Sequence, residues 1–112
     1  LLIAGGETTV TVKGHGKGGR NQEMALAAAI ELEHIDGIFF LSFATDGTDG
    51  PTDAAGAFAD STTAQHAHQR NLHIEAFLDN NDSYNFFRRL DDLIVTGPTG
   101  SNVMDIQLVI IE

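Results

Sequence analysis

The segment from residue 8 to residue 30 constrains the fold of this chain more than any other. Thr8–Val12 is rich in β-branched residues, which favours a strand. Lys13–Arg20 follows as a loop with glycine at four of its eight positions. The stretch from Asn21 to about Glu33 is rich in alanine and carries Glu23 in its first turn, which predicts a helix. The segment therefore predicts a strand, a glycine loop and a helix in succession.

The glycine loop also carries a chemical signal. Glycine lets backbone N–H groups approach a ligand closely, because no Cβ intervenes. A helix N-terminus adds unpaired N–H donors and the positive end of the helix dipole. Three of the six Lys and Arg residues of the chain lie between positions 13 and 20. The loop therefore predicts a binding site for a phosphate or a carboxylate.

A second strand is expected at Ile38–Ala44, where a continuous apolar run is typical of a central strand covered on both faces. With the strand and helix before it, this run predicts a right-handed βαβ unit. The other expected elements are strands at 1–4, 93–96 and 106–111 and helices at 61–71 and 81–90. Thr62 and Gln65 are expected to form a capping box, and Asn81 to cap the last helix. The predicted fold class is α/β, a layered mixed β-sheet with packed helices, a βαβ unit and terminal hairpins.

Size and composition set further bounds. The 112 residues form a single domain, and the net charge of −10 argues against binding to nucleic acid or to an anionic membrane. No apolar run reaches the length of about 18 residues that a membrane helix needs. The chain has no cysteine, which fits a reducing, cytoplasmic setting. Because it starts without Met and ends inside an apolar strand, we expect a domain of a longer protein.

A group of acidic residues follows the apolar run, within the loop Thr45–Asp53. Asp46, Asp49 and Asp53 lie at the carboxyl end of the predicted strand, where ligands bind in open α/β sheets. They are candidates to hold Mg²⁺, to orient a hydroxyl group or to act as a base. Asp-Gly pairs are also simple turn formers, so the residues alone leave both interpretations open. The loop lacks the Glu at position 12 that an EF-hand requires.

Two further groups carry weaker signals. The polar residues of 96–105 could line a pocket, but they are more typical of a self-capped turn. His66 and His68 are two positions apart and so do not share a helical face, which argues against a zinc site.

Gly14, Gly16 and Gly19 also match the pattern G-x-G-x-x-G of dinucleotide sites. The pattern requires an acidic residue about 20 positions further on, at the end of the next strand. Asp36 has about that spacing but precedes the strand, whereas Asp46 lies too far away. A Walker loop is absent, because Lys17 is followed by Gly18 rather than by Ser or Thr.

Five motifs occur in an order typical of one family. They are Gly5–Val10, Gly18–Glu23, Thr45–Ala57, Asn81–Tyr84 and Thr96–Gly100. Together they cover essentially the whole chain, which closely resembles the C-terminal MOFRL domain of glycerate 2-kinases, a family once called hydroxypyruvate reductases. One departure follows Gly100, where the chain reads Ser-Asn-Val-Met-Asp and the family pattern is Thr-Asn-Val-Asn-Asp. Met104 therefore replaces a polar residue of the family.

The resemblance implies ATP-dependent phosphorylation of (R)-glycerate to 2-phosphoglycerate with Mg²⁺. It implies an active site in the cleft between this domain and a larger N-terminal domain that carries a catalytic lysine. Arg20 matches the functional arginine of the family and is the expected catalytic residue; its fork suits a phosphate or the glycerate carboxylate. The expected substrate- and phosphate-binding residues are Lys17, Gly18, Gly19, Asn21, Asp46, Asp49 and Asp53. Asp46 and Asp49 are the candidates for Mg²⁺.

Two alternative functions remain open from the sequence. The G-x-G-x-x-G pattern and the older family name suit a hydroxypyruvate reductase that uses NAD(P)H. A non-catalytic module that binds an anionic metabolite through Arg20 is the other. Under the kinase interpretation we expect these 112 residues alone to be inactive, because they supply one wall of the cleft. Assembly as a homodimer also remains open.

Overall fold

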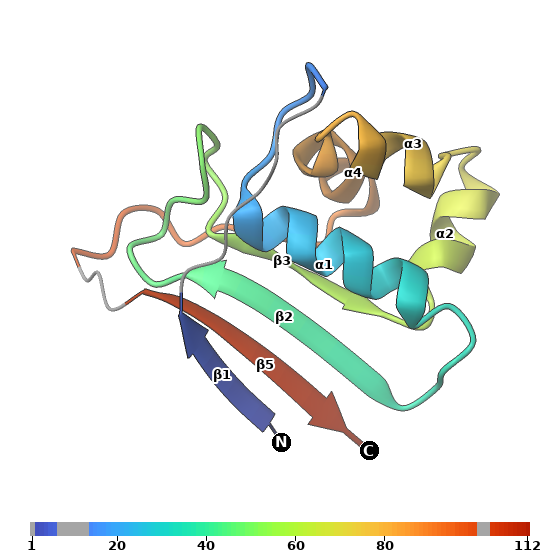
Figure 1. Cartoon of the computed structure of the whole chain (residues 1–112), viewed down its shortest axis with the longest axis horizontal. Helices are drawn as coiled ribbons and strands as arrows, with labels where there is room; N and C mark the ends of the chain where they lie inside the picture. The colour runs from blue at the N-terminus through green and yellow to red at the C-terminus, as the bar shows by residue number, and fades with distance from the viewer. Residues whose placement is uncertain (1, 7–13, 101–103) are drawn as a thin grey trace.

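A computed structural model describes residues 2–6, 14–100 and 104–112. The strands are β1 (Leu2–Gly6), β2 (Ile38–Ala44), β3 (Gly56–Asp60), β4 (Leu93–Ile94) and β5 (Asp105–Ile111). The helices are α1 (Arg20–Glu31), α2 (Thr63–Gln69), α3 (Ile74–Asp79) and α4 (Ser83–Leu90). The strands form one sheet in the order β1-β5-β2-β3-β4, and the helices gather on one side of it (Figure 1). The predicted α/β class is confirmed.

The strand directions refine the predicted βαβ unit. Every pair of neighbouring strands is antiparallel, and β5 lies between β1 and β2. Because β1 and β2 are both antiparallel to β5, they run in the same direction. The path β1–α1–β2 therefore joins two parallel strands that a third strand separates. Thr8–Val12, the strand expected before the glycine loop, lies outside the described residues.

The expected C-terminal hairpin is not formed. The strands on either side of the loop at 97–102 do not pair with each other, since β4 pairs with β3 whereas β5 pairs with β1 and β2. The seven residues of β5 take an interior position between β1 and β2, and the two residues of β4 form the edge next to β3. A turn-forming loop in the sequence does not by itself specify that its flanking strands are neighbours.

The helices differ from the sequence expectations mainly at their ends. The capping box is not formed, because the backbone N–H and hydroxyl of Thr62 both donate to the carboxylate of Asp60 instead. Asn81 does not cap α4 either, because its own backbone is left-handed, with φ of 54°, and the helix begins two residues later. Helix α3 was not expected from the sequence, since its six residues are too short for a clear periodic pattern.

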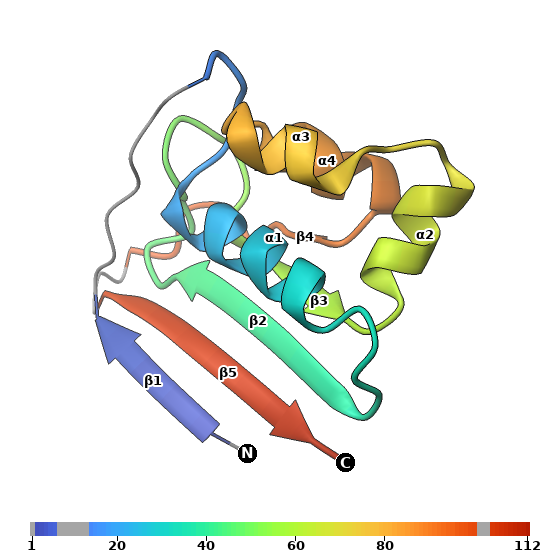
Figure 2. The same cartoon turned by 45° about the vertical axis from the view of Figure 1, so that its right-hand side comes forward.

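The core lies between α1 and the sheet. Ala25 and Ala29 of α1 are fully buried, as are Ala57 and Ala59 of β3. These small side chains let the helix approach the sheet closely, while Phe86 and other apolar residues of α2–α4 close the core at the side. Figure 2 shows α1 lying across β2 and β3 and leaving β1 and β5 uncovered. Among the described helices, none combines the length and hydrophobicity that a membrane crossing requires.

The opposite face of the sheet is apolar. Side chains alternate between the two faces of a strand. Phe40 packs into the helix-covered core and the Ser42 hydroxyl donates to Asn21 of α1, so Phe39, Leu41 and Phe43 point to the other face. We expected both faces of β2 to be covered. Within the part of the chain that the structure describes, only the face toward α1 is covered.

Candidate active site at the start of helix α1

The glycine loop is fixed by the segment before helix α4. The backbone N–H groups of Gly14, Gly16 and Lys17 donate to oxygen atoms of residues 80–82 over 2.9–3.0 Å. The loop lies so close that a Cβ at Gly16 would stand 2.3 Å from the Asp82 side chain. The first half of the loop therefore uses its N–H groups within the protein. Only the second half of the predicted anion-binding loop is left to meet a ligand.

A carboxylate of the protein itself occupies the N-terminus of α1. Asp49 is 1% exposed and accepts the backbone N–H groups of Asn21 at 3.0 Å and Gln22 at 2.9 Å. Its two oxygens also accept the side-chain amides of the same two residues, at 3.1 and 2.9 Å. The helix dipole and its unpaired donors thus stabilise Asp49. This geometry makes Asp49 the cap of α1, with four N–H donors on its two oxygens.

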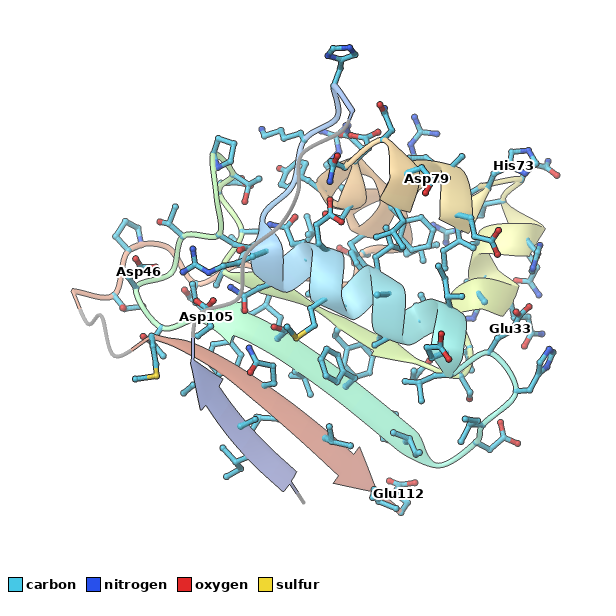
Figure 3. The ribbon with its side chains drawn as sticks, in the orientation of Figure 1. Glu33, Asp46, His73, Asp79, Asp105 and Glu112 are labelled. Atoms are coloured by element: carbon cyan, nitrogen blue, oxygen red, sulfur yellow. The ribbon has the colours of Figure 1, made fainter. Side chains whose placement is uncertain are left out.

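Arg20, the first residue of α1, forms a fork with Asp105 at the start of β5. Its Nε donates to one carboxylate oxygen and its Nη2 donates to the other over 2.9 Å. Asp105 is 1% exposed, whereas the Arg20 side chain is 36% exposed. Such bidentate pairs fix the plane of the guanidinium as well as its position. The pair holds Arg20 at the surface in a defined orientation. Figure 3 shows Asp105 at the start of β5, near the first turn of α1.

A cavity of about 310 Å³ opens beside this arginine. Its lining residues are Gly16, Gly18, Gly19, Arg20, Glu23, Gly50, Pro51 and Asn81. The backbone N–H groups of Gly18 and Gly19 donate to no residue that the structure describes. Glu23 brings a carboxylate to the same cavity, and the side-chain amide of Asn81 donates to it over 2.8 Å. The cavity lining therefore brings together the backbone of Gly18 and Gly19, the Arg20 side chain and one carboxylate acceptor.

The structure separates the predicted site residues into two sets. Arg20, Gly18 and Gly19 meet at the cavity. Asn21 is buried and donates to Asp49, while the Nζ of Lys17 lies 4.4 Å from the centre of the Tyr84 ring.

The two remaining carboxylates also lie outside the cavity lining. Asp46 accepts the N–H of Thr48 over 3.0 Å within its own loop, and Figure 3 places it well out on the loop after β2. Asp53 accepts the hydroxyl of Tyr84 over 2.7 Å. Together with Asp49, these residues hold turns and helices in place in this structure.

The described residues do not fit a magnesium site of their own. Within residues 2–6, 14–100 and 104–112, no group of three or more His, Asp or Glu side chains could hold a metal ion. Both oxygens of Asp49 already accept N–H donors, which compete with a cation for the same lone pairs. Mg²⁺ commonly binds through one or two carboxylates together with substrate phosphates and water. An ion at this site would therefore depend on ligands from elsewhere.

Three residues of the site were not among the expected site residues, although Asp105 belonged to the polar group at 96–105 that was interpreted mainly as a self-capped turn. Asp105 is 85 positions from Arg20, and no local pattern links the two. Glu23 follows Arg20 by three positions, so their shared helix face could have indicated a common site. Asn81 was assigned to a helix cap, because its type and position fit that role.

A second cavity, of about 410 Å³, lies at the other end of the helical layer. Asp60, His66, Arg70 and Asp92 are among its lining residues. Burial, together with the negative charge of nearby Asp60, raises the pKa of the Asp92 carboxyl above its ordinary value. None of the predicted site residues reaches this cavity, so the start of α1 is the stronger candidate site.

The geometry also removes the support for a dinucleotide site. Gly14 and Gly16 of the G-x-G-x-x-G pattern donate their N–H groups to residues 80–82 rather than to an open crevice. A dinucleotide fold also needs neighbouring parallel strands, whereas all neighbouring strands here are antiparallel.

Comparison with known proteins identifies the family. A model described as the MOFRL family matches residues 1–105. The chain belongs to the MOFRL family. Among curated relatives, the D-glycerate 2-kinase of Thermotoga maritima is 55% identical over 105 residues, which are 94% of this chain and 25% of that protein. The glycerate 2-kinase of Pyrococcus horikoshii is 44% identical over 112 residues, covering 99% of this chain and 25% of the relative.

Solved structures agree with this membership. The crystal structure of glycerate kinase from Thermotoga maritima superposes with a TM-score of 0.97 at 53% identity, covering 99% of this chain and 27% of that one. This MOFRL chain thus spans about a quarter of the length of the curated relatives that it matches.

Proposed function

We propose that this MOFRL domain forms one wall of the active site of an ATP-dependent glycerate 2-kinase. The observation that carries the proposal is the fork between Arg20 and Asp105 at the rim of the cavity. Relatives that are 44–55% identical over nearly the whole domain bear the names glycerate 2-kinase and D-glycerate 2-kinase. The remaining wall would come from the larger part that these relatives possess.

The cavity suits a small, polar, anionic substrate. Arg20 and Asp105 together carry no net charge, so attraction depends on directed donors rather than on a positive patch. Phosphoryl transfer relies mainly on positioning and on stabilising charge as it moves. In the proposed role, Arg20 and the N–H groups of Gly18 and Gly19 bind the phosphoryl group or the glycerate carboxylate. The carboxylate of Glu23 accepts a hydroxyl of glycerate.

The larger domain would complete the chemistry. Because the described residues form no magnesium site, an ion that accompanies ATP would be held by the nucleotide phosphates and by the other domain. Lys17, Asn21, Asp46, Asp49 and Asp53 would support the site rather than contact the substrate.

The test is glycerate-dependent ADP formation by the full-length protein that carries this domain. We expect the Arg20→Ala variant to lose roughly a hundredfold or more in kcat, as removal of a charge-stabilising group does elsewhere. The matched control is Arg89→Ala, because Arg89 is exposed at the end of α4, away from the cavity. Phosphorus NMR of the product distinguishes 2-phosphoglycerate from its 3-phospho isomer.

Other outcomes would assign other functions. Absence of ADP release from the folded full-length protein would overturn the kinase proposal. Oxidation of NAD(P)H with hydroxypyruvate would favour the reductase. Saturable glycerate binding without any turnover would favour an anion-binding module instead.

A further inference from the structure

The face of the sheet opposite the helices presents a continuous apolar surface. Alternation along β1, β5, β2 and β3, combined with the observed register, places eight large apolar side chains of these four strands on it. They are Ile3, Phe39, Leu41, Phe43, Phe58, Ile106, Leu108 and Ile110, here called the open-face cluster. The cluster crosses four adjacent strands without a polar side chain inside it, and Asp60 stands at its margin.

Among residues 2–6, 14–100 and 104–112, no helix or strand packs over the open-face cluster. Phe39 and Phe58 stack with ring centres 5.9 Å apart. Ile3 is 68% exposed and Ile110 is 38% exposed, and the other six are partly exposed. Monomeric proteins rarely expose contiguous apolar patches larger than a few hundred Å². A sheet face with this composition is ordinarily buried against another layer.

We infer that the open-face cluster is the docking surface for a helical layer from the same polypeptide, outside residues 1–112. Four strands at a spacing of about 4.8 Å make the cluster about 14 Å wide. That width exceeds what a single extended segment covers and suits packed helices about 10 Å in diameter. In the finished protein the sheet would then lie between two helical layers.

Two observations favour the same polypeptide over a second copy of this chain. The curated relatives are about four times as long as the matched region, so each has ample chain to supply a layer. Each copy of this chain also carries a net charge of −10, and two such copies repel each other. This inference depends on the open-face cluster and is independent of the proposed phosphoryl transfer.

Cysteine labelling of the full-length protein tests the inference. Because residues 1–112 contain no cysteine, Ile3→Cys and Ile110→Cys each add one thiol to this region, whose modification peptide mapping can measure. The matched control is Ala27→Cys on the exposed side of α1. Both isoleucines are exposed in the domain alone, so neither replacement disturbs the domain core. We expect maleimide to modify both at least about 100 times more slowly than the control in the native monomer.

Each alternative outcome has a definite meaning. Modification at the rate of the Ala27→Cys variant would show an open face and overturn the inference. Protection that disappears on dilution from dimer to monomer would assign the face to a second copy and would overturn it equally. Kinase activity does not enter the measurement, so failure of the proposed function leaves the result interpretable.

Discussion

The carboxylate of Asp105 holds the guanidinium of Arg20 in a bidentate fork across 85 positions of sequence. The pair links the first residue of β5 to the first residue of α1. It therefore ties the orientation of the expected catalytic arginine to an interior strand of the sheet.

Loss of this fork should impair turnover through Arg20. We expect Asp105→Asn to lower kcat of the full-length enzyme by roughly 10–100-fold, because an amide offers only one acceptor to the guanidinium. A double-mutant cycle with Arg20→Lys distinguishes a role of Asp105 in positioning Arg20 from a loss of stability of the domain. If Asp105 acts through Arg20, its substitution should have little further effect on kcat in the Arg20→Lys background. Asp60→Asn is the matched control, and additive effects would contradict the positioning role.

The cap formed by Asp49 should contribute strongly to stability. Asp49→Ala leaves four N–H donors near the start of α1 without their acceptor. We expect the free energy of unfolding to fall by about 2–4 kcal/mol, measured by urea denaturation. Asp36→Ala, at an exposed position, should change it by less than about 0.5 kcal/mol. Equal small effects of the two substitutions would argue against the capping role.

Tyr84 should titrate above its ordinary pKa. The hydrogen bond to Asp53, and then burial, raise the pKa of the phenol. A raised folded pKa adds stability that is fully present below the unfolded pKa of about 10 and is lost as pH rises through the folded pKa. Because Tyr84 is the only tyrosine in these 112 residues and tryptophan is absent, tyrosinate absorbance of this chain follows it alone. We expect Asp53→Asn to lower this pKa, and an unchanged titration would contradict the assignment.

The backbone conformation at Met104 favours glycine over a residue that carries a Cβ. Its φ is 109°, a region that residues with a Cβ rarely adopt, and its side chain is 46% exposed. Glycine has no such restriction, so Met104→Gly should raise the free energy of unfolding by up to about 1 kcal/mol. Replacement by Asn, the residue of the family pattern, should act in the same direction. Thermal unfolding measures both variants, and a loss of stability in both would disprove strain at this position.

Local patterns predicted much of the fold. The apolar run at Ile38–Ala44 matches β2 at both ends, and the alanine-rich segment became α1. Strand order could not be predicted, because nothing local in β5 indicates that it inserts between β1 and β2. The expected capping box at Thr62 was replaced by a different local contact, because Thr62 donates to Asp60 two positions before it.

The sequence indicated only part of the candidate site, because contacts between distant residues complete it. Residue type and spacing indicated the start of α1, where glycine and arginine occur together and where the structure places a cavity. They could not show that Asp49 already occupies the helix N-terminus or that residues 80–82 accept the N–H groups of the loop. Protein groups and a ligand compete for the same N–H donors here. The protein groups that accept them lie far away in the sequence, so local patterns do not reveal them.

The place of β5 between β1 and β2 also affects how the protein is made. A ribosome delivers β1 and β2 long before β5, yet β5 is the neighbour of both and, among the described strands, the only partner of β1. While synthesis continues, β2 keeps an unpaired edge and β1 lacks a partner. Unpaired strands of this kind invite association between nascent chains. The sheet can therefore close only after Ile111 has left the exit tunnel, so protection by chaperones would matter most just before that moment.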